Sequence, residues 1–129
     1  MQSDIEIYLL SCPTSKIREW LQKHFIVLTE TRINSELYSL VLESKASEHQ
    51  DQPIQVQILE QAAGKRFTSV WFDSAKTPWQ TDTDCARDAY AVLECEVRCN
   101  MTSWQEVSNE DPDQWWHINQ YEEGPFIWK

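Results

Sequence analysis

Hydrophobic and polar residues alternate with a period of two in several short segments of the chain, a pattern typical of half-buried β-strands. In the first segment, Ile5–Leu10, every second residue is a large aliphatic. Glu36–Glu43 carries hydrophobic residues at both sets of positions, so we expect that strand to be covered on both faces. The pattern predicts further strands at Phe25–Glu30, Ile54–Ile58, Phe67–Asp73, from about Cys95, at Trp115–Gln120 and at Phe126–Trp128, with Thr102–Val107 as an additional candidate.

Two other segments repeat their hydrophobic residues with the period of an α-helix. The first follows Pro13, with Thr14 or Ser15 placed to cap it, and its hydrophobic face comprises Ile17, Trp20, Leu21 and His24. The second is predicted to begin at Thr81–Asp84, where acidic side chains favour the positive end of the helix dipole. Residues 93–101 also alternate with a period of two, so we expect this helix to end near Leu93.

Turn-forming residues separate these elements. The polar segment Ser44–Pro53 is predicted to be a loop, and Ala63–Lys65 contains a glycine suited to a tight turn. Ser108–Asp113 is predicted to be an acidic turn, and Glu123–Pro125 is predicted to be the turn before the last strand.

The predicted elements follow the order β-α-β-β-β, and that order then repeats. We therefore predict an α+β fold in which two βαβββ-like modules form a mostly antiparallel sheet with two helices. The 129 residues are enough for a single domain, with 1–64 and 65–129 as candidate pseudo-repeat halves. A ferredoxin-like sheet with extra strands is the alternative fold.

This order of elements is similar to that of the vicinal-oxygen-chelate and glyoxalase-type folds. The resemblance implies a divalent metal that is held by His and Glu side chains from strands of both modules. The opening strands of the two halves here, Ile5–Leu10 and Phe67–Asp73, contain no His, so the chain departs from that pattern.

The balance of charge is strongly acidic, with 11 basic and 21 acidic side chains and a net charge of −10. Nucleic-acid-binding proteins gain affinity from Lys and Arg side chains that displace counterions from phosphates. We therefore expect no nucleic-acid binding through phosphate contacts. Thr77–Trp128 contains eleven acidic and two basic residues, a net charge of −9, and such a region attracts a basic protein partner.

The hydrophobic segments are all shorter than the roughly 20 residues of a transmembrane helix. The N-terminal segment also lacks the basic region and the long apolar run of a signal peptide. We therefore expect a cytoplasmic protein that does not bind membranes. In a reducing compartment the four cysteines, Cys12, Cys85, Cys95 and Cys99, are interpreted as buried hydrophobic side chains.

Tryptophan is the most unusual feature of the composition, with seven residues in the chain. Each one can be a core residue, but Trp115 and Trp116 are neighbours on a predicted strand and should point to opposite faces. Indole rings beside carboxylates suit a cation or an arginine-rich peptide. The candidate binding residues are Trp79, Asp82, Asp84, Trp104, Trp115, Trp116 and His117.

Catalytic chemistry is not indicated by any motif of the chain. Cys85, at a helix N-terminus, could pair with His117 as a nucleophile, but neighbouring carboxylates would raise its pKa. Cys95 and Cys99 would lie about 13 Å apart on one strand, too far to share a zinc ion with His117. We predict no catalytic residues, no metal site and no cofactor, and we favour a protein that is not an enzyme.

The leading hypothesis is a non-enzymatic protein-interaction or regulatory module whose acidic, tryptophan-rich surface docks on a basic protein partner. The second interpretation is a small-molecule binder or enzyme with a cleft between the two modules, lined by Trp71, Trp79, Trp104 or Trp116. A homodimer with tryptophans in its interface is the third.

Overall fold

A computed structural model describes residues 4–45, 52–74, 76–100 and 114–128. The described residues form eight strands and two helices, in the order that the periodicity predicts. The elements are β1 (Ile5–Leu10), α1 (Thr14–His24), β2 (Phe25–Arg32), β3 (Leu37–Ser44), β4 (Ile54–Leu59), β5 (Phe67–Phe72), α2 (Asp82–Leu93), β6 (Val97–Asn100), β7 (Gln114–Ile118) and β8 (Glu123–Ile127).

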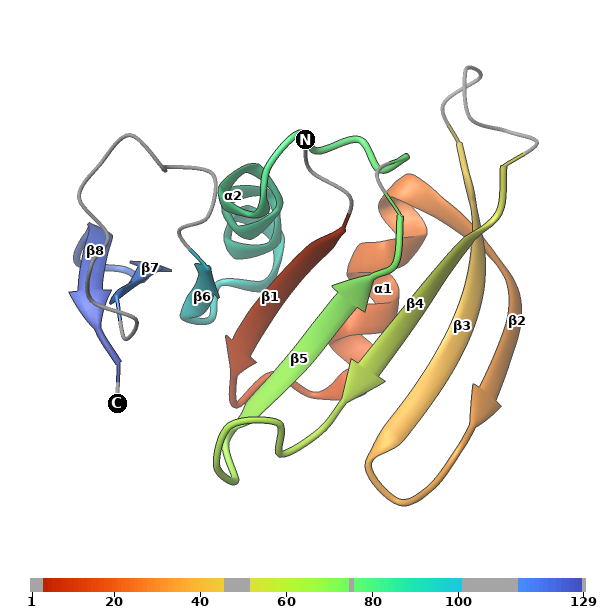
Figure 1. Ribbon diagram of the computed structural model, residues 1–129, viewed down its shortest axis with the longest axis horizontal. Coiled ribbons are helices and arrows are strands. Elements are labelled where there is room, and N and C mark those ends of the chain that lie inside the picture. Colours follow the sequence, from red (N-terminus) through yellow and green to blue (C-terminus); the bar gives the residue numbers. More distant parts are fainter. Residues whose placement is uncertain (1–3, 46–51, 75, 101–113, 129) are drawn as a thin grey trace.

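All eight strands belong to one antiparallel sheet, in the order β2-β3-β4-β5-β1-β6-β7-β8 (Figure 1), which confirms the α+β fold. The first strand, β1, lies between β5 and β6 and pairs with both. β5 and β6 therefore run parallel to each other, and α2 connects them as a split βαβ unit, the feature that the ferredoxin-like alternative predicts. β1 belongs to the first predicted module, yet it lies between β5 and β6 of the second. The division of the chain into two modules therefore stays a prediction.

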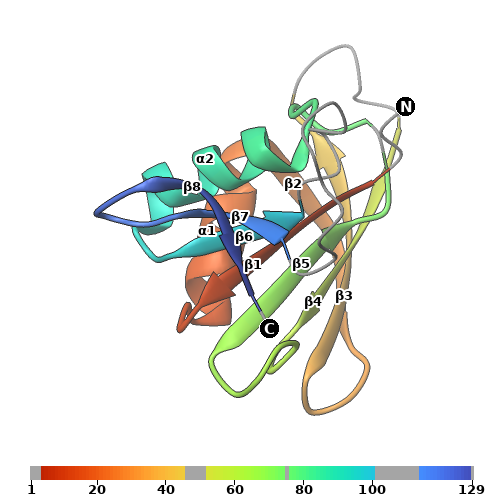
Figure 2. The same ribbon diagram turned by 60° about the vertical axis from the view of Figure 1, so that its left-hand side comes forward.

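Both helices cover the same face of the sheet, and the other face, called here the open face, carries no helix (Figures 1 and 2). Successive side chains of each strand point to opposite faces of the sheet. Ile5, Ile7 and Leu9 of β1 are fully buried under the helices. Tyr8 and the other intervening residues of β1 lie on the open face, half-buried. The sheet is strongly twisted, so β2–β5 and β6–β8 are seen at very different angles in Figure 1.

The core beneath the helices is organised around paired indole rings. Trp20 of α1 stacks on Trp79, with ring centroids 5.5 Å apart, and both indole N–H groups donate to the carboxylate of Asp88 in α2, at 3.3 and 2.9 Å. His24 Nε2 lies 2.8 Å from the same carboxylate. Asp88 thus joins α1, α2 and the segment before α2, and it allows both polar indole groups to be buried.

The helix boundaries agree with the sequence more closely at α2 than at α1. Thr81 caps α2 by accepting a hydrogen bond from the backbone N–H of Asp84, at 3.1 Å. The predicted cap of α1 is wrong: the N-cap residue is Pro13, and the Thr14 hydroxyl donates to Glu60 instead.

Two strand boundaries also differ from the prediction. β6 begins at Val97 rather than Cys95, because Glu94 ends α2 in the left-handed conformation, with φ of 58°, and redirects the chain. Glu123–Pro125 belongs to β8 and is not a turn. The turn precedes it, where the side chain of Asn119 accepts hydrogen bonds from the backbone N–H groups of Tyr121 and Glu122. β8 is an edge strand, which tolerates a proline.

The prediction that Glu36–Glu43 is covered on both faces is also wrong. Leu40 and Leu42 of β3 are buried by the helices, but the alternate residues lie half-buried on the open face. The predicted strand Thr102–Val107, the turn Ser108–Asp113 and most of the loop Ser44–Pro53 lie outside the described residues.

Candidate functional site

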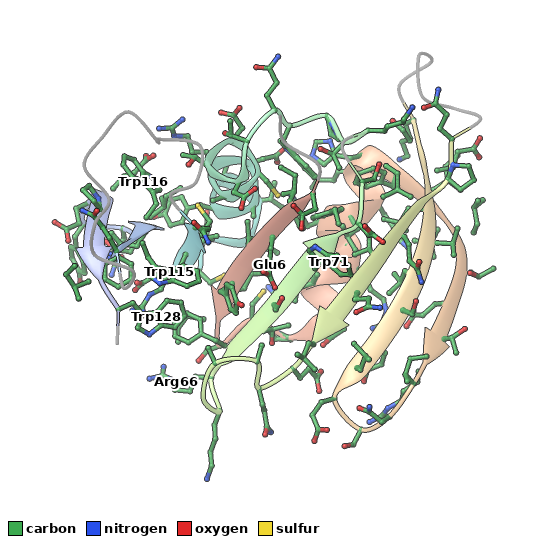
Figure 3. All side chains as sticks on the ribbon, viewed as in Figure 1. Glu6, Arg66, Trp71, Trp115, Trp116 and Trp128 are labelled. Carbon is green, nitrogen blue, oxygen red and sulfur yellow. The ribbon has the colours of Figure 1, made fainter. Side chains whose placement is uncertain are left out.

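An aromatic cluster occupies the end of the open face that β1, β5, β7 and β8 share. The rings of Tyr8, Trp115 and Trp128 lie in mutual edge-to-face contact, with centroids 5.0 to 5.7 Å apart. Trp115 and Trp128 lie side by side in Figure 3. Phe67 and Phe126 extend the cluster, with centroids 4.8 and 6.2 Å from that of Trp128. Strand pairing, rather than nearness in the sequence, brings these rings together.

Arg98 of β6 is enclosed by this cluster. Its guanidinium carbon lies 4.5 Å from the ring centroid of Trp128 and 4.7 Å from those of Phe67 and Phe126. Its Nε donates to Glu96 at 2.9 Å. Cation–π contacts of this kind are strongest where the charge is shielded from water. The charge of Arg98 is therefore already neutralised within the fold.

A pocket of about 450 Å³ opens beside the cluster, lined by Tyr8, Ala63, Gly64, Trp115 and Trp128, and we call it the aromatic pocket. Glu6 is the neighbour of Tyr8 on the open face of β1, and its carboxylate accepts a hydrogen bond from the Ser69 hydroxyl at 2.7 Å. Burial, and then the negative charge of Glu6, raise the pKa of the Tyr8 hydroxyl. The volume falls within the range of small-molecule sites.

A second concave region lies between α2 and the β7–β8 turn. It consists of two adjoining cavities of about 260 and 480 Å³. Both are lined by Tyr90, Asn119, Gln120 and Tyr121; Glu94 and Glu96 line the first, and Arg87, Ile118, Glu122 and Glu123 line the second. We call this region the acidic groove.

The acidic groove combines exposed aromatic surface with unbalanced negative charge. Tyr121 is 85% exposed. The side chain of Glu122 is 68% exposed, although its carboxylate lies 3.2 Å from His117 Nε2. Arg87 is held by Glu123, at 2.7 Å, and by Asp84, at 3.8 Å. Glu123 and Glu96 are thus paired with Arg87 and Arg98, and the exposed carboxylates of Glu94 and Glu122 carry the remaining negative charge of the groove.

The structure distributes the predicted binding residues over three places. Trp79 is 7% exposed in the core, and Asp82 is also buried. Trp115 and His117 lie on the open face. Trp116 lies on the helix side of the sheet, as expected for the residue next to Trp115 on a strand. Its indole N–H donates to Glu123 of the groove at 3.1 Å. Asp84 pairs with Arg87 beside the groove, and Trp104 lies outside the described residues.

Sequence reasoning missed several residues of these two sites. The strand pattern at Ile5–Leu10 places Tyr8 on the face opposite the aliphatic residues, which was a usable signal. Tyr90 and Tyr121 carried no such signal, because the groove forms only when the β7–β8 turn lies beside the end of α2.

The cysteines on the helix side are not arranged for chemistry. Burial, and then the charge of Asp82, raise the pKa of Cys85 well above its ordinary value, and burial raises that of Cys99 to about 12. The sheet separates Cys85 from His117, so the nucleophilic pair considered from the sequence does not form. Within the described ranges, no three His, Cys, Asp or Glu side chains are grouped to hold a metal ion.

None of the helices in the described part of the chain combines the length and the apolar character that membrane crossing requires. Comparison with protein-family models, with curated proteins and with solved structures found no match to this chain.

Proposed function

We propose that the protein is a non-enzymatic interaction module that docks a basic segment of a partner protein in the acidic groove. The observation that carries this proposal is the combination of the exposed carboxylates of Glu94 and Glu122 with two tyrosines around one concave surface. Lysine or arginine side chains of a partner would pair with the carboxylates and lie against the tyrosine rings.

Exposure of the groove supports this assignment over a purely structural role for its residues. Glu94 and Tyr121 are exposed, so neither contributes much to the hydrophobic core. The excess of negative charge in Thr77–Trp128 would also speed the approach of a basic partner at low ionic strength.

The direct test is an NMR titration of the full chain with a short arginine-rich peptide, at low and at high salt. We expect backbone amide shifts to concentrate at 90–96 and 118–123, with an affinity that falls as salt increases because exposed charges are screened. The double variant Glu94→Gln, Glu122→Gln should weaken binding about tenfold.

The matched control is Glu19→Gln, Asp73→Asn, which removes two exposed charges from other parts of the surface. Equal weakening by both double variants, or shifts spread over all acidic positions, would show unspecific attraction to a negative protein and would overturn the proposal. Tyr121→Ala should weaken binding without altering the salt dependence, since it removes ring contacts and no charge.

A second candidate function is small-molecule binding in the aromatic pocket. It is favoured by the three rings of Tyr8, Trp115 and Trp128 around about 450 Å³. The inter-module cleft considered from the sequence called for Trp71, Trp79, Trp104 or Trp116. Trp71, Trp79 and Trp116 are not among the described lining residues of the aromatic pocket, and Trp104 lies outside the described residues. Trp115→Ala separates the two functions, because it should abolish binding in the aromatic pocket and leave the peptide titration unchanged.

A further inference from the structure

A further pocket lies at the end of the sheet where β1 leads into α1. It has a volume of about 290 Å³, and none of its described lining residues also lines the aromatic pocket or the acidic groove. Its walls come from residues 11–14 and 60–61, from Lys65 and Arg66 of the β4–β5 turn, and from Thr68 of β5. Arg66 is labelled at that turn in Figure 3. Because two cations line it, we call it the basic pocket.

The two cations of the basic pocket are not neutralised by carboxylates of the fold. Three arginines elsewhere in the chain form ion pairs with glutamates, namely Arg18, Arg87 and Arg98. Within the described residues, no carboxylate is in ion-pair contact with Lys65 or Arg66. The Nε of Arg66 donates to the Ser11 hydroxyl at 3.1 Å, which holds the guanidinium at the pocket. Its terminal N–H groups therefore stay available to another acceptor.

A buried hydroxyl of the same pocket is not used by the fold. Thr68 is 7% exposed and lies on the helix side of β5, like the core residues Val70 and Phe72. Its hydroxyl forms no hydrogen bond within the described part of the chain, whereas that of Ser69 donates to Glu6. The Thr68 oxygen is not sealed from solvent, and the basic pocket is the space that Thr68 lines. A buried hydroxyl of this kind favours an acceptor that arrives from outside the fold.

The start of α1 adds a backbone donor to the basic pocket. The N-cap residue is Pro13, which offers no capping side chain, and the first turn carries no acidic residue. Backbone N–H groups in the first turn of a helix have no intrahelical acceptor and favour anions. Thr14, the first residue of α1, lines the pocket. The Glu60 carboxylate also lines it, and it accepts from the Thr14 hydroxyl, at 2.6 Å, rather than from the backbone.

We propose that the basic pocket binds the phosphate group of a small phosphorylated molecule. Lys65 and Arg66 balance the charge of the phosphate, and the Thr68 hydroxyl and the Thr14 backbone N–H donate to its oxygens. These donors come from three different elements, an arrangement that suits a tetrahedral anion better than a planar carboxylate. The volume is near the lower end for small-molecule sites, which leaves room for a small organic group. The net charge of −10 disfavours a nucleic acid as the source of the phosphate.

The test is an NMR titration of the full chain with glycerol 3-phosphate, inorganic phosphate and acetate as separate probes. For both phosphates we expect backbone amide shifts to concentrate at 11–16 and 60–68. Glycerol 3-phosphate should bind at least as tightly as inorganic phosphate, and acetate should bind about tenfold more weakly. Equal affinity for acetate would contradict a tetrahedral ligand. Binding of inorganic phosphate without binding of the ester would contradict a phosphorylated small molecule.

The contribution of the two cations is tested by the double variant Lys65→Gln, Arg66→Gln, which should weaken binding of glycerol 3-phosphate about tenfold. The matched control is Lys23→Gln, Lys76→Gln, which removes two exposed positive charges from other parts of the surface. The control should leave the affinity almost unchanged. Equal weakening by both double variants would show unspecific attraction to positive charge, and the proposal would fail.

The Thr68 hydroxyl is tested by Thr68→Val, which should weaken binding of glycerol 3-phosphate about fivefold because a hydrogen bond to a charged group is lost. The stability of the free chain in urea should not decrease, since this hydroxyl has no partner in the described fold. An unchanged affinity, or a loss of stability, would overturn the role of Thr68 as a ligand donor. The groove variant Glu94→Gln, Glu122→Gln should leave this titration unchanged, so the two proposed sites are tested independently.

Discussion

The two faces of the sheet use tryptophan in different ways. On the helix side, Trp20 and Trp79 are stacked and buried, and Asp88 accepts a hydrogen bond from each indole. On the open face, Trp115 and Trp128 are half-buried and line the aromatic pocket, and Trp128 also lies against Arg98. A high tryptophan content therefore does not by itself indicate a binding surface. Whether an indole ring lies in the core or at the surface depends on the face of the sheet that it occupies and on the acceptor that its N–H group finds there.

The largest loss of stability is expected when the stacked tryptophan pair of the core is disrupted. Trp20→Ala should lower the free energy of unfolding by about 3–5 kcal/mol, because it leaves a cavity beneath both helices and an unused acceptor on Asp88. Trp128→Ala, the matched change on the open face, should cost no more than about 2 kcal/mol. Urea unfolding of both variants measures the difference, and equal losses would contradict the division between the two faces.

An intermediate loss of stability is expected when Arg98, the cation enclosed by the aromatic cluster of the open face, is replaced. Arg98→Met should destabilise the fold by about 1–2 kcal/mol, because the ring contacts and the ion pair with Glu96 are lost together. Arg98→Lys retains the charge but not the planar group, so its stability should lie between those of wild type and Arg98→Met. Urea unfolding of the two variants decides this order. If Arg98→Met is as stable as the wild type, the cation does not contribute to the stability of the aromatic cluster.

The smallest effect concerns alkaline pH. The pKa of Tyr8 is raised in the folded state, so its contribution to stability is complete below its unfolded pKa of about 10 and is lost as pH rises through the folded value. Wild-type stability should therefore fall more steeply than that of Tyr8→Phe between about pH 9 and pH 11. Glu6→Gln should reduce this difference without removing it, since burial is the larger cause. Parallel curves from urea unfolding would contradict the assignment.

Much of the fold was predictable because local signals and tertiary packing agree. The bounds of α2 follow from the cap at Thr81 and from the change of period after Leu93. Errors arose where one side chain overrode the pattern. Asn119 forms its turn through its own carboxamide, and Pro125 is accepted in β8 because this is an edge strand of the sheet that the described residues form.

The candidate sites were less predictable, because they depend on contacts between distant segments. Alternation placed Trp115 and Trp116 on opposite faces, as observed. No local pattern indicated that Tyr8 would meet Trp115 or Trp128. Those contacts follow from the insertion of β1 between β5 and β6, a choice of strand order that hydrophobic periodicity does not encode.

The position of β1 has a consequence for the synthesis of the protein. β1 is synthesised before both of its partners, residues 67–72 and 97–99, so the centre of the sheet closes only after β6 has been made. The meander β2–β5 is complete earlier, because its strands are joined by hairpin connections. Until then both edges of β1 lack their native partners, and unpaired strand edges are prone to incorrect pairing and aggregation.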